Sequence, residues 1–112
     1  MGVKKEALEL LPGTLVILVL KALERGPLHG YAIMKAIHDH SGEVLQVGES
    51  SLYPALQRLL LNGWVEAEWG VSENNRRARY YTLTPAGRKQ FAGERADLER
   101  MMGAIRRVLQ TA

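Results

Sequence analysis

The middle of the chain carries three successive local signals, and they limit what the whole chain can fold into. Leucines at helical spacing just before Asn62 predict a short amphipathic helix. Two strand-like segments follow, Trp64–Trp69 and Ala78–Leu83, joined by a polar connection that contains arginines. Thr84 and Pro85 then supply an N-cap and a first-turn proline, which is typical of a helix start. Together these signals predict mainly α structure with a small two-stranded β-ribbon.

The short amphipathic helix is expected to begin at Ser50 or Ser51. With Ser51 as the N-cap, Pro54 falls in the first turn, where its missing N–H costs little because that amide needs no partner. The expected buried stripe consists of Leu52, Leu56, Leu59 and Leu60. In the strand that follows, Val65, Ala67 and Trp69 share the face expected to be buried, and Glu66 and Glu68 share the other.

Two helices are predicted before this one. Pro12–Arg25 is apolar almost all round, so it needs burial on more than one side, against the domain core and against a partner subunit. A second helix runs from His29 or Gly30 to His40, after a turn at Gly26-Pro27. Val44–Val47 is a candidate short strand. Three helices followed by a β-ribbon and another helix predict a winged helix-turn-helix.

The last helix is predicted from Pro85 to about Leu109, a length of roughly 37 Å. Phe91, Leu98 and Ile105 recur every seven residues, and no other segment is left to cover this stripe. Packing on a second copy is the expected solution, although the helix can also fold back on the first helix of its own chain. The expected dimer interface comprises Leu15, Val19, Phe91, Leu98, Met101, Met102, Ile105 and Leu109.

We therefore predict a winged-helix domain over residues 1–84 and a C-terminal dimerisation helix over residues 85–112. The chain has 112 residues and no cysteine, so disulfides and thiolate chemistry are excluded. The net charge of +3 is too small to indicate nucleic-acid binding by itself, so the distribution of the charges carries the argument. The apolar run Leu15–Leu20 is too short to span a bilayer, and we expect a soluble, cytoplasmic protein that does not associate with membranes.

A winged helix binds double-stranded DNA through short polar side chains that contact the base edges and through cations that contact the phosphates. The short amphipathic helix offers the first group, and the ribbon tip offers the second. Serines at a helix start also act as plain caps, and charged hairpin tips are often merely solvated. The candidate DNA-binding residues are Ser50, Ser51, Tyr53, Pro54, Gln57 and Arg58, with Tyr31 and Lys35 on the second helix and Arg76, Arg77 and Arg79 on the ribbon.

Three motifs resemble those of the PadR-like winged-helix transcriptional regulators, in the same order and over nearly the whole chain. Pro27–Ile33 is similar to that family's entry to its second helix. Ser51–Leu56, followed by Gly63-Trp64-Val65, is similar to its recognition helix and the turn after it. Arg79–Gly87 is similar to the second wing strand and the start of the last helix.

The resemblance implies a dimeric bacterial repressor whose C-terminal helices form much of the interface, acting on genes for detoxification, transport or stress. A dimer predicts a pseudo-palindromic operator with half-sites roughly 10 bp apart. Some members of that family bind a flat aromatic or drug-like effector between subunits. The candidate walls of such a pocket here are Trp64, Trp69, Phe91, Met101 and Met102, which are also ordinary core residues.

Two other classes of function compete with this interpretation. An enzyme or metal site finds little support, because His38 and His40 point to different faces of a helix and no phosphate-binding glycine loop is present. We therefore expect no catalytic residue, no metal and no cofactor. A winged helix that docks proteins instead of DNA is the stronger rival, and the basic ribbon tip is the feature that argues against it.

Overall fold

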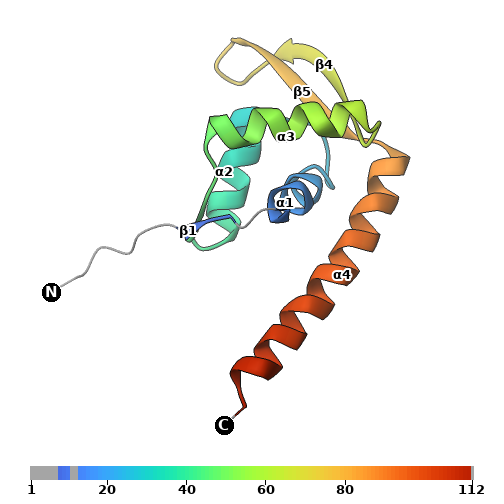
Figure 1. Ribbon diagram of the computed structural model, residues 1–112. Helices are drawn as coiled ribbons and strands as arrows, with labels where there is room; N and C mark the ends of the chain where they lie inside the picture. The colour runs from blue at the N-terminus through green and yellow to red at the C-terminus, as the bar shows by residue number, and fades with distance from the viewer. Residues whose placement is uncertain (1–7, 11–12, 112) are drawn as a thin grey trace, which may run out of the picture.

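The structure is a computed structural model that describes residues 8–10 and 13–111. Helices form the body, and short strands connect and flank them (Figure 1). The elements in chain order are β1 (Leu8–Glu9), α1 (Thr14–Ala22), β2 (Leu28–His29), α2 (Gly30–His40), β3 (Leu45–Gln46), α3 (Glu49–Leu61), β4 (Val65–Val71), β5 (Arg77–Leu83) and α4 (Pro85–Leu109). This order confirms the predicted winged helix-turn-helix with a long C-terminal helix.

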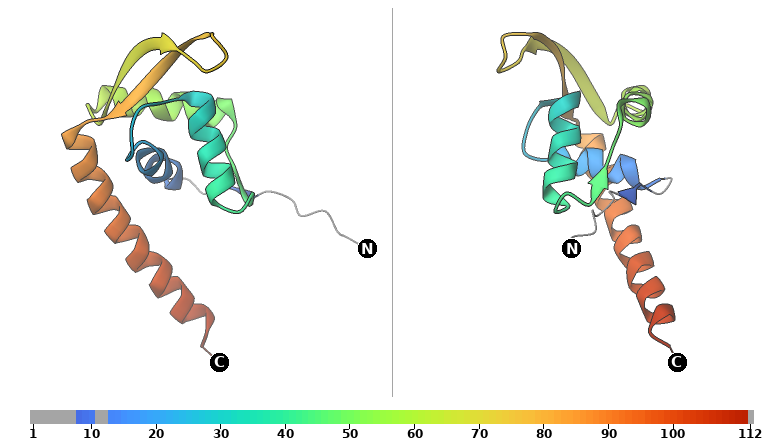
Figure 2. Two further views of the ribbon diagram at one scale, coloured as in Figure 1. Left: turned by 180° about the vertical axis from the view of Figure 1, so that it is seen from behind. Right: turned by 90° about the vertical axis from the view of Figure 1, so that its left-hand side faces the viewer.

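The wing and the free end of α4 lie at opposite ends of the molecule. The hairpin β4–β5 lies beside α3 at one end, and α4 leaves the body and runs away from it (Figures 1 and 2). α4 begins at its predicted residue because the Thr84 Oγ1 accepts a hydrogen bond from the Gly87 amide at 3.0 Å, with Pro85 at the first helical position. The same hydroxyl donates to the Gly63 carbonyl at 2.7 Å, which ties the helix start to the end of α3.

The core lies where α1, α2 and α3 meet the base of the wing. Its largest fully buried side chains are Leu20, Leu23, Ile33, Leu52, Leu56, Leu59, Val19 and Val65. Leu52, Leu56, Leu59 and Leu60 were predicted as the buried stripe of α3. The first three are at most 1% exposed, and Leu60 is half-buried. Burial of each such side chain contributes about 1.5–3 kcal/mol, so this cluster accounts for much of the stability of the body.

The wing belongs to a three-stranded antiparallel sheet in the order β2-β5-β4. Val65 faces Leu83 at its base and Val71 faces Arg77 at its outer end. β2 extends this sheet by pairing Leu28 with Tyr81, a strand that the sequence did not predict because only a turn was visible there. β3 falls within the predicted segment 44–47 and pairs in parallel with β1.

Three expectations are corrected by the structure. α3 begins at Glu49 with Gly48 as its N-cap, so Ser51 is inside the helix and is not the cap. Pro54 is consequently the sixth helical residue and lies beyond the first turn. Trp69 was expected on the buried face of its strand, but it is 58% exposed because β4 extends past the body. Pro12, the predicted start of the first helix, lies outside the described residues.

Candidate nucleic-acid interface

The side of α3 that faces away from the core is polar. Its residues Ser50, Ser51, Tyr53, Pro54, Gln57 and Arg58 are all exposed, while Leu52, Ala55, Leu56 and Leu59 between them are buried. The structure therefore brings all the candidate residues of this helix onto its accessible surface. Leu61 is also exposed at the C-terminal end of the same helix, so the polar character belongs to the first two-thirds of α3.

The N-terminus of α3 has no side-chain cap. Gly48 has extended backbone angles, and its carbonyl accepts hydrogen bonds from the amides of Ser51 and Leu52 at 3.2 and 3.0 Å. Because no side chain covers the first amides, they remain available to an anion, which the helix dipole also favours. The hydroxyls of Ser50 and Ser51 are likewise not used as caps.

Tyr53 packs across the start of α2 through a glycine. A Cβ added to Gly30 would lie 2.5 Å from the Tyr53 hydroxyl oxygen, so the glycine leaves room for the Tyr53 ring in its observed position. Burial raises the pKa of the Tyr53 hydroxyl above its usual range, with Glu49 as a further cause, so the group stays a hydrogen-bond donor. Tyr53 is 45% exposed, so it both packs against α2 and reaches the surface.

α2 presents two further candidate residues beside this contact. Its N-cap is His29, whose Nδ1 accepts from the Ala32 amide at 3.2 Å. Tyr31 follows immediately and is 67% exposed, so it does not fill the edge of the core. Lys35 is exposed and bonds Asp39 at 2.8 Å. The hydrogen bond to Asp39 and the charge of its carboxylate raise the pKa of Lys35, and the hydrogen bond from Lys35 lowers the pKa of Asp39. A phosphate must therefore compete with Asp39 for Lys35.

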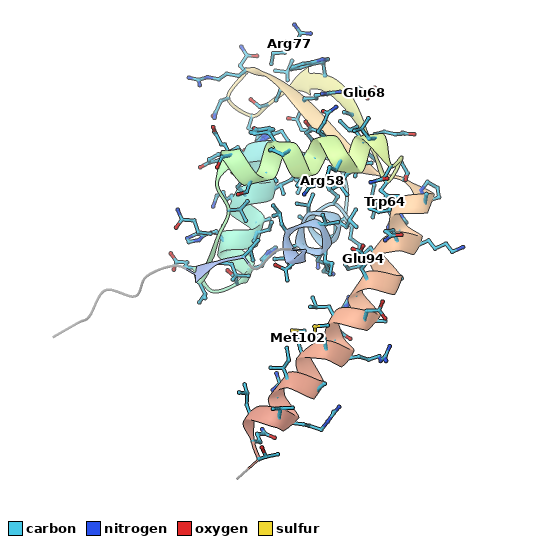
Figure 3. The ribbon with its side chains drawn as sticks, viewed as in Figure 1. Arg58, Trp64, Glu68, Arg77, Glu94 and Met102 are labelled. Carbon is cyan, nitrogen blue, oxygen red and sulfur yellow. The ribbon has the colours of Figure 1, made fainter. Side chains whose placement is uncertain are left out.

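The wing tip is a tight loop that carries arginine. The Ser72 amide donates to the Arg76 carbonyl at 2.7 Å, and the Arg76 amide donates to the Ser72 hydroxyl at 3.3 Å. Asn75 has a φ of 58°, a left-handed conformation that asparagine tolerates better than most residues. Arg76, Arg77 and Arg79 are all exposed, and Figure 3 places Arg77 on the outer part of the wing.

The exposed Trp69 is a residue of this surface that the sequence did not identify. The Arg77 guanidinium carbon lies 4.4 Å from the centroid of the Trp69 ring, a cation–π contact. Arg79 is the register partner of Trp69 across the hairpin, and its own guanidinium lies 5.9 Å from the Tyr81 ring. Aromatic and cationic side chains thus alternate along one face of the wing. The ring contacts hold Arg77 and Arg79, two of the three arginines, in defined positions.

The residues predicted for a dimer interface fall into three groups by their burial. Val19 and Phe91 are 0% and 6% exposed, because the core of the same protomer already covers them. Leu15 and Leu98 are half-buried. The others lie on the outer half of α4 and are exposed: Met101, Met102, Ile105 and Leu109. Figure 3 shows Met102 on the part of α4 that has left the body.

The candidate effector walls do not come together. Trp64 is half-buried against the core, Trp69 is on the wing, and both methionines are on the free part of α4. Phe91 lines a small groove of about 350 Å³ that α4 forms with Glu24 and Leu83. Within residues 8–10 and 13–111, no three His, Asp or Glu side chains gather in a way that would hold a metal ion. No helix of that same part of the chain has the length and apolarity needed to cross a bilayer.

A helix with an exposed polar face, flanked by an arginine-bearing hairpin, defines a winged helix-turn-helix protein. The sequence profile of the transcriptional regulator PadR-like family matches residues 19–93, and the chain belongs to that family. A transcriptional regulator from Clostridium thermocellum has the same fold, with a TM-score of 0.76 and 30% identity. The match covers 85% of this chain and 92% of that one. The family is one of regulators, in agreement with the expectation that the chain is not an enzyme.

Two further relatives differ from this chain in length. PadR of Bacillus subtilis, solved in complex with operator DNA, is 25% identical with a TM-score of 0.63, over 71% of this chain and 46% of that one. A 37.1 kDa protein in transposon TN4556 of Streptomyces fradiae is 44% identical over 91 residues, which is 80% of this chain. The match spans 24% of that curated relative, about a quarter of its length.

Proposed function

We propose that this chain binds double-stranded operator DNA as a homodimer and represses transcription. The observation that carries the proposal is the uncapped, polar outer face of α3, with arginines on the neighbouring wing. The first amides of α3 and the arginines suit phosphates, and the Gln57 amide suits adenine in the major groove. The family relative from Bacillus subtilis that was solved with operator DNA supports this assignment. A regulator of this kind acts where the chromosome lies, so we place it in the cytoplasm.

The outer half of α4 supports the dimer. Met101, Met102, Ile105, Val108 and Leu109 are between 45% and 79% exposed on a single protomer. An apolar surface of this kind on a projecting helix favours association with a second copy. Two copies related by a two-fold axis would present two α3 helices, so we expect a pseudo-palindromic operator with half-sites roughly 10 bp apart.

The first experiment is footprinting of the purified chain on genomic DNA, followed by titration of the recovered site. Binding should weaken linearly in log–log form as salt rises, with a slope of about −0.9 for each neutralised phosphate. A salt-independent interaction, or no binding to any duplex at low ionic strength, would instead favour the protein-docking alternative.

A reporter gene behind the recovered site should be expressed less when the chain is present; increased expression would contradict repression.

Substitutions separate contacts to phosphates from contacts to bases. Arg76→Ala together with Arg77→Ala should weaken specific and random DNA alike and make the salt slope less steep by about 1 for each lost phosphate contact. Gln57→Ala should reduce the preference for the operator over random DNA, by about 1–3 kcal/mol. Arg100→Ala and Gln110→Ala on α4 are the matched controls and should leave both affinities unchanged. An equal loss on both DNAs in the Gln57 variant would refute its role in base recognition.

A further inference from the structure

A groove of the structure lies away from the proposed DNA interface. It has a volume of about 870 Å³ and runs between α1 and α2, and the Gly26-Pro27 turn and Leu45 also line it. No residue of α3, the wing or α4 lines it. A volume of this size is within the range of small-molecule sites. The groove is therefore a candidate binding site that DNA contact does not explain.

The walls of the groove are aliphatic. Leu18, Ala22, Leu28, Ala36 and Ile37 form its floor and sides. The alanines on both facing helices leave the width that longer side chains would fill. No tryptophan, tyrosine or phenylalanine lines the groove, so it offers no broad aromatic face for a flat ring. Walls of this composition suit a flexible hydrocarbon chain, which gains free energy in proportion to the apolar area it buries.

The polar groups at the mouth of the groove carry a net positive charge. Lys21 and Glu24 form an ion pair, so their charges cancel. The Lys21 ammonium lowers the pKa of Glu24, which keeps that carboxylate ionised and the pair intact. Arg25 is exposed and has no acidic partner within the described part of the chain. The lining thus retains one uncompensated cation.

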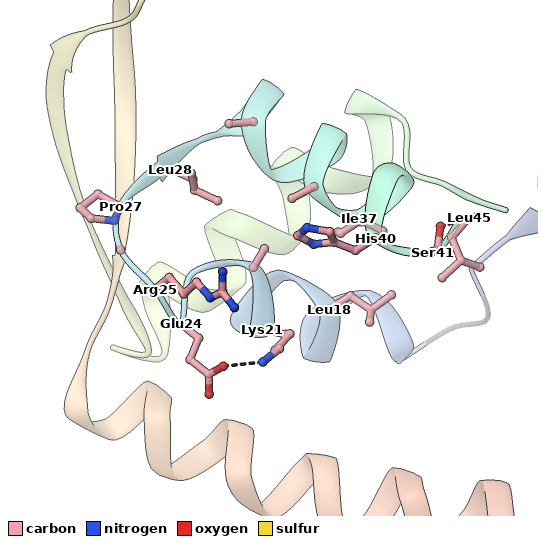
Figure 4. Close-up of a pocket in the computed structure, with 14 residues that line it drawn as sticks. Leu18, Lys21, Glu24, Arg25, Pro27, Leu28, Ile37, His40, Ser41 and Leu45 are labelled. Carbon is pink, nitrogen blue, oxygen red and sulfur yellow. Dashed lines mark hydrogen bonds and ion pairs between the residues drawn. The ribbon is translucent and has the colours of Figure 1, made fainter. Parts of the chain in front are cut away.

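Two of these polar groups point into the same space. Figure 4 shows the Arg25 guanidinium directed into the groove from the α1 side and the His40 ring directed into it from α2. A guanidinium offers a planar pair of donors that matches the two oxygens of a carboxylate. An anion bound to Arg25 would leave its attached chain free to run along the aliphatic walls.

We propose that the groove between α1 and α2 binds an aliphatic carboxylate, with its head group on Arg25 and its hydrocarbon chain along Leu18, Ala22 and Ala36. Binding here does not depend on DNA, so it can fail or succeed separately from the proposed function. The other possible occupant is a segment of a second copy, and the experiment below includes a measurement that detects it.

The test uses the full chain without DNA and three probes that share an eight-carbon chain. Calorimetric titration with octanoate should be saturable at one molecule per chain. Octanol lacks the charge and should bind about fivefold more weakly, as expected for loss of one solvent-exposed ion pair. Octyltrimethylammonium carries the opposite charge and should bind more weakly than octanol. Equal affinities for octanoate and octanol, or no saturable binding of octanoate, would overturn the proposal.

Three variants locate the site. Arg25→Gln should lower the affinity for octanoate to that for octanol and leave octanol unchanged. Arg100→Gln, which changes an exposed arginine of α4 in the same way, should change neither. Ala36→Leu should weaken both probes by occupying the groove. Circular dichroism checks that each variant is folded, and sedimentation measures association. If Arg25→Gln binds octanoate normally, the head group does not lie on Arg25 and the proposal is wrong. If Ala36→Leu alters association without altering octanoate binding, a second copy occupies the groove and the proposal is equally wrong.

Discussion

The two halves of α4 share a secondary structure and differ in their surroundings. In the first half, Gly87 and Phe91 are buried against α1, the wing and the turn after α3. In the second half, Met101, Ile105 and Leu109 remain exposed although they continue the same apolar stripe. The first half of this continuous helix therefore packs against its own domain, and the second half leaves an apolar surface exposed. Four variants of this helix test that division.

Phe91→Ala should have the largest effect. The side chain is 6% exposed in the core, so its loss removes apolar burial and leaves a cavity, which destabilises the fold by about 3–5 kcal/mol. Urea denaturation followed by circular dichroism measures the change. Arg106→Ala, a truncation at an exposed position of the other half that lies outside the apolar surface, is the control and should alter unfolding by less than about 0.5 kcal/mol. Similar losses in both variants would contradict the division.

Gly87→Ala should destabilise the chain by about 2–3 kcal/mol, even though alanine favours helices. The added Cβ would lie 2.0 Å from the Trp64 carbonyl oxygen and 2.8 Å from the Leu83 Cδ1. The backbone at Trp64 cannot yield without shifting the turn after α3, so overpacking outweighs the gain in helix propensity. Thermal unfolding measures the effect, and an unchanged melting temperature would show that α4 is not held this closely.

Met102→Glu combined with Ile105→Glu should weaken association of two copies by about 2 kcal/mol or more, because charges replace apolar contacts at the proposed interface. Sedimentation over a concentration series is the measurement. Arg100→Glu introduces an acid at an exposed neighbouring position without removing an apolar side chain, and it should leave association nearly unchanged. A wild-type chain that stays monomeric throughout would end the dimer proposal.

Gly93→Ala should have the smallest effect and the opposite sign to Gly87→Ala. Nothing lies within 4 Å of the position where its Cβ would be added, so the substitution brings helix propensity without a clash. The expected result is a stabilisation of about 0.5–1 kcal/mol, measured by the same thermal unfolding. A destabilised Gly93 variant would indicate that a partner helix approaches this glycine closely.

The elements that the sequence predicted best are those with local stop and start signals. α2 runs from Gly30 to His40 as expected, and α4 spans the predicted Pro85–Leu109, because Thr84 and Pro85 define its start without reference to the rest of the chain. The start of α3 was misplaced because Ser51 is a better cap by residue type than Gly48. The observed cap depends on the extended backbone of the glycine.

The sequence predicted which residues lie at the candidate site better than it predicted how far the exposed surface extends. The alternation in β4 assigns Trp69 to the same face as Val65, but it does not show where the body beneath that face ends. A heptad pattern likewise treats Phe91 and Ile105 alike, although the first lies in the core and the second on the surface. Close approaches such as Tyr53 on Gly30 depend on tertiary packing and leave no local pattern.

Pro54 has a further consequence at the centre of α3. A proline at the sixth position cannot donate to the carbonyl of Ser50, the residue four positions before it. That main-chain oxygen does not receive the usual amide proton, and it belongs to an exposed residue of the polar face. Under the DNA-binding proposal we expect this oxygen to be a main-chain acceptor within the interface, and replacement of the side chains on that face would not remove it.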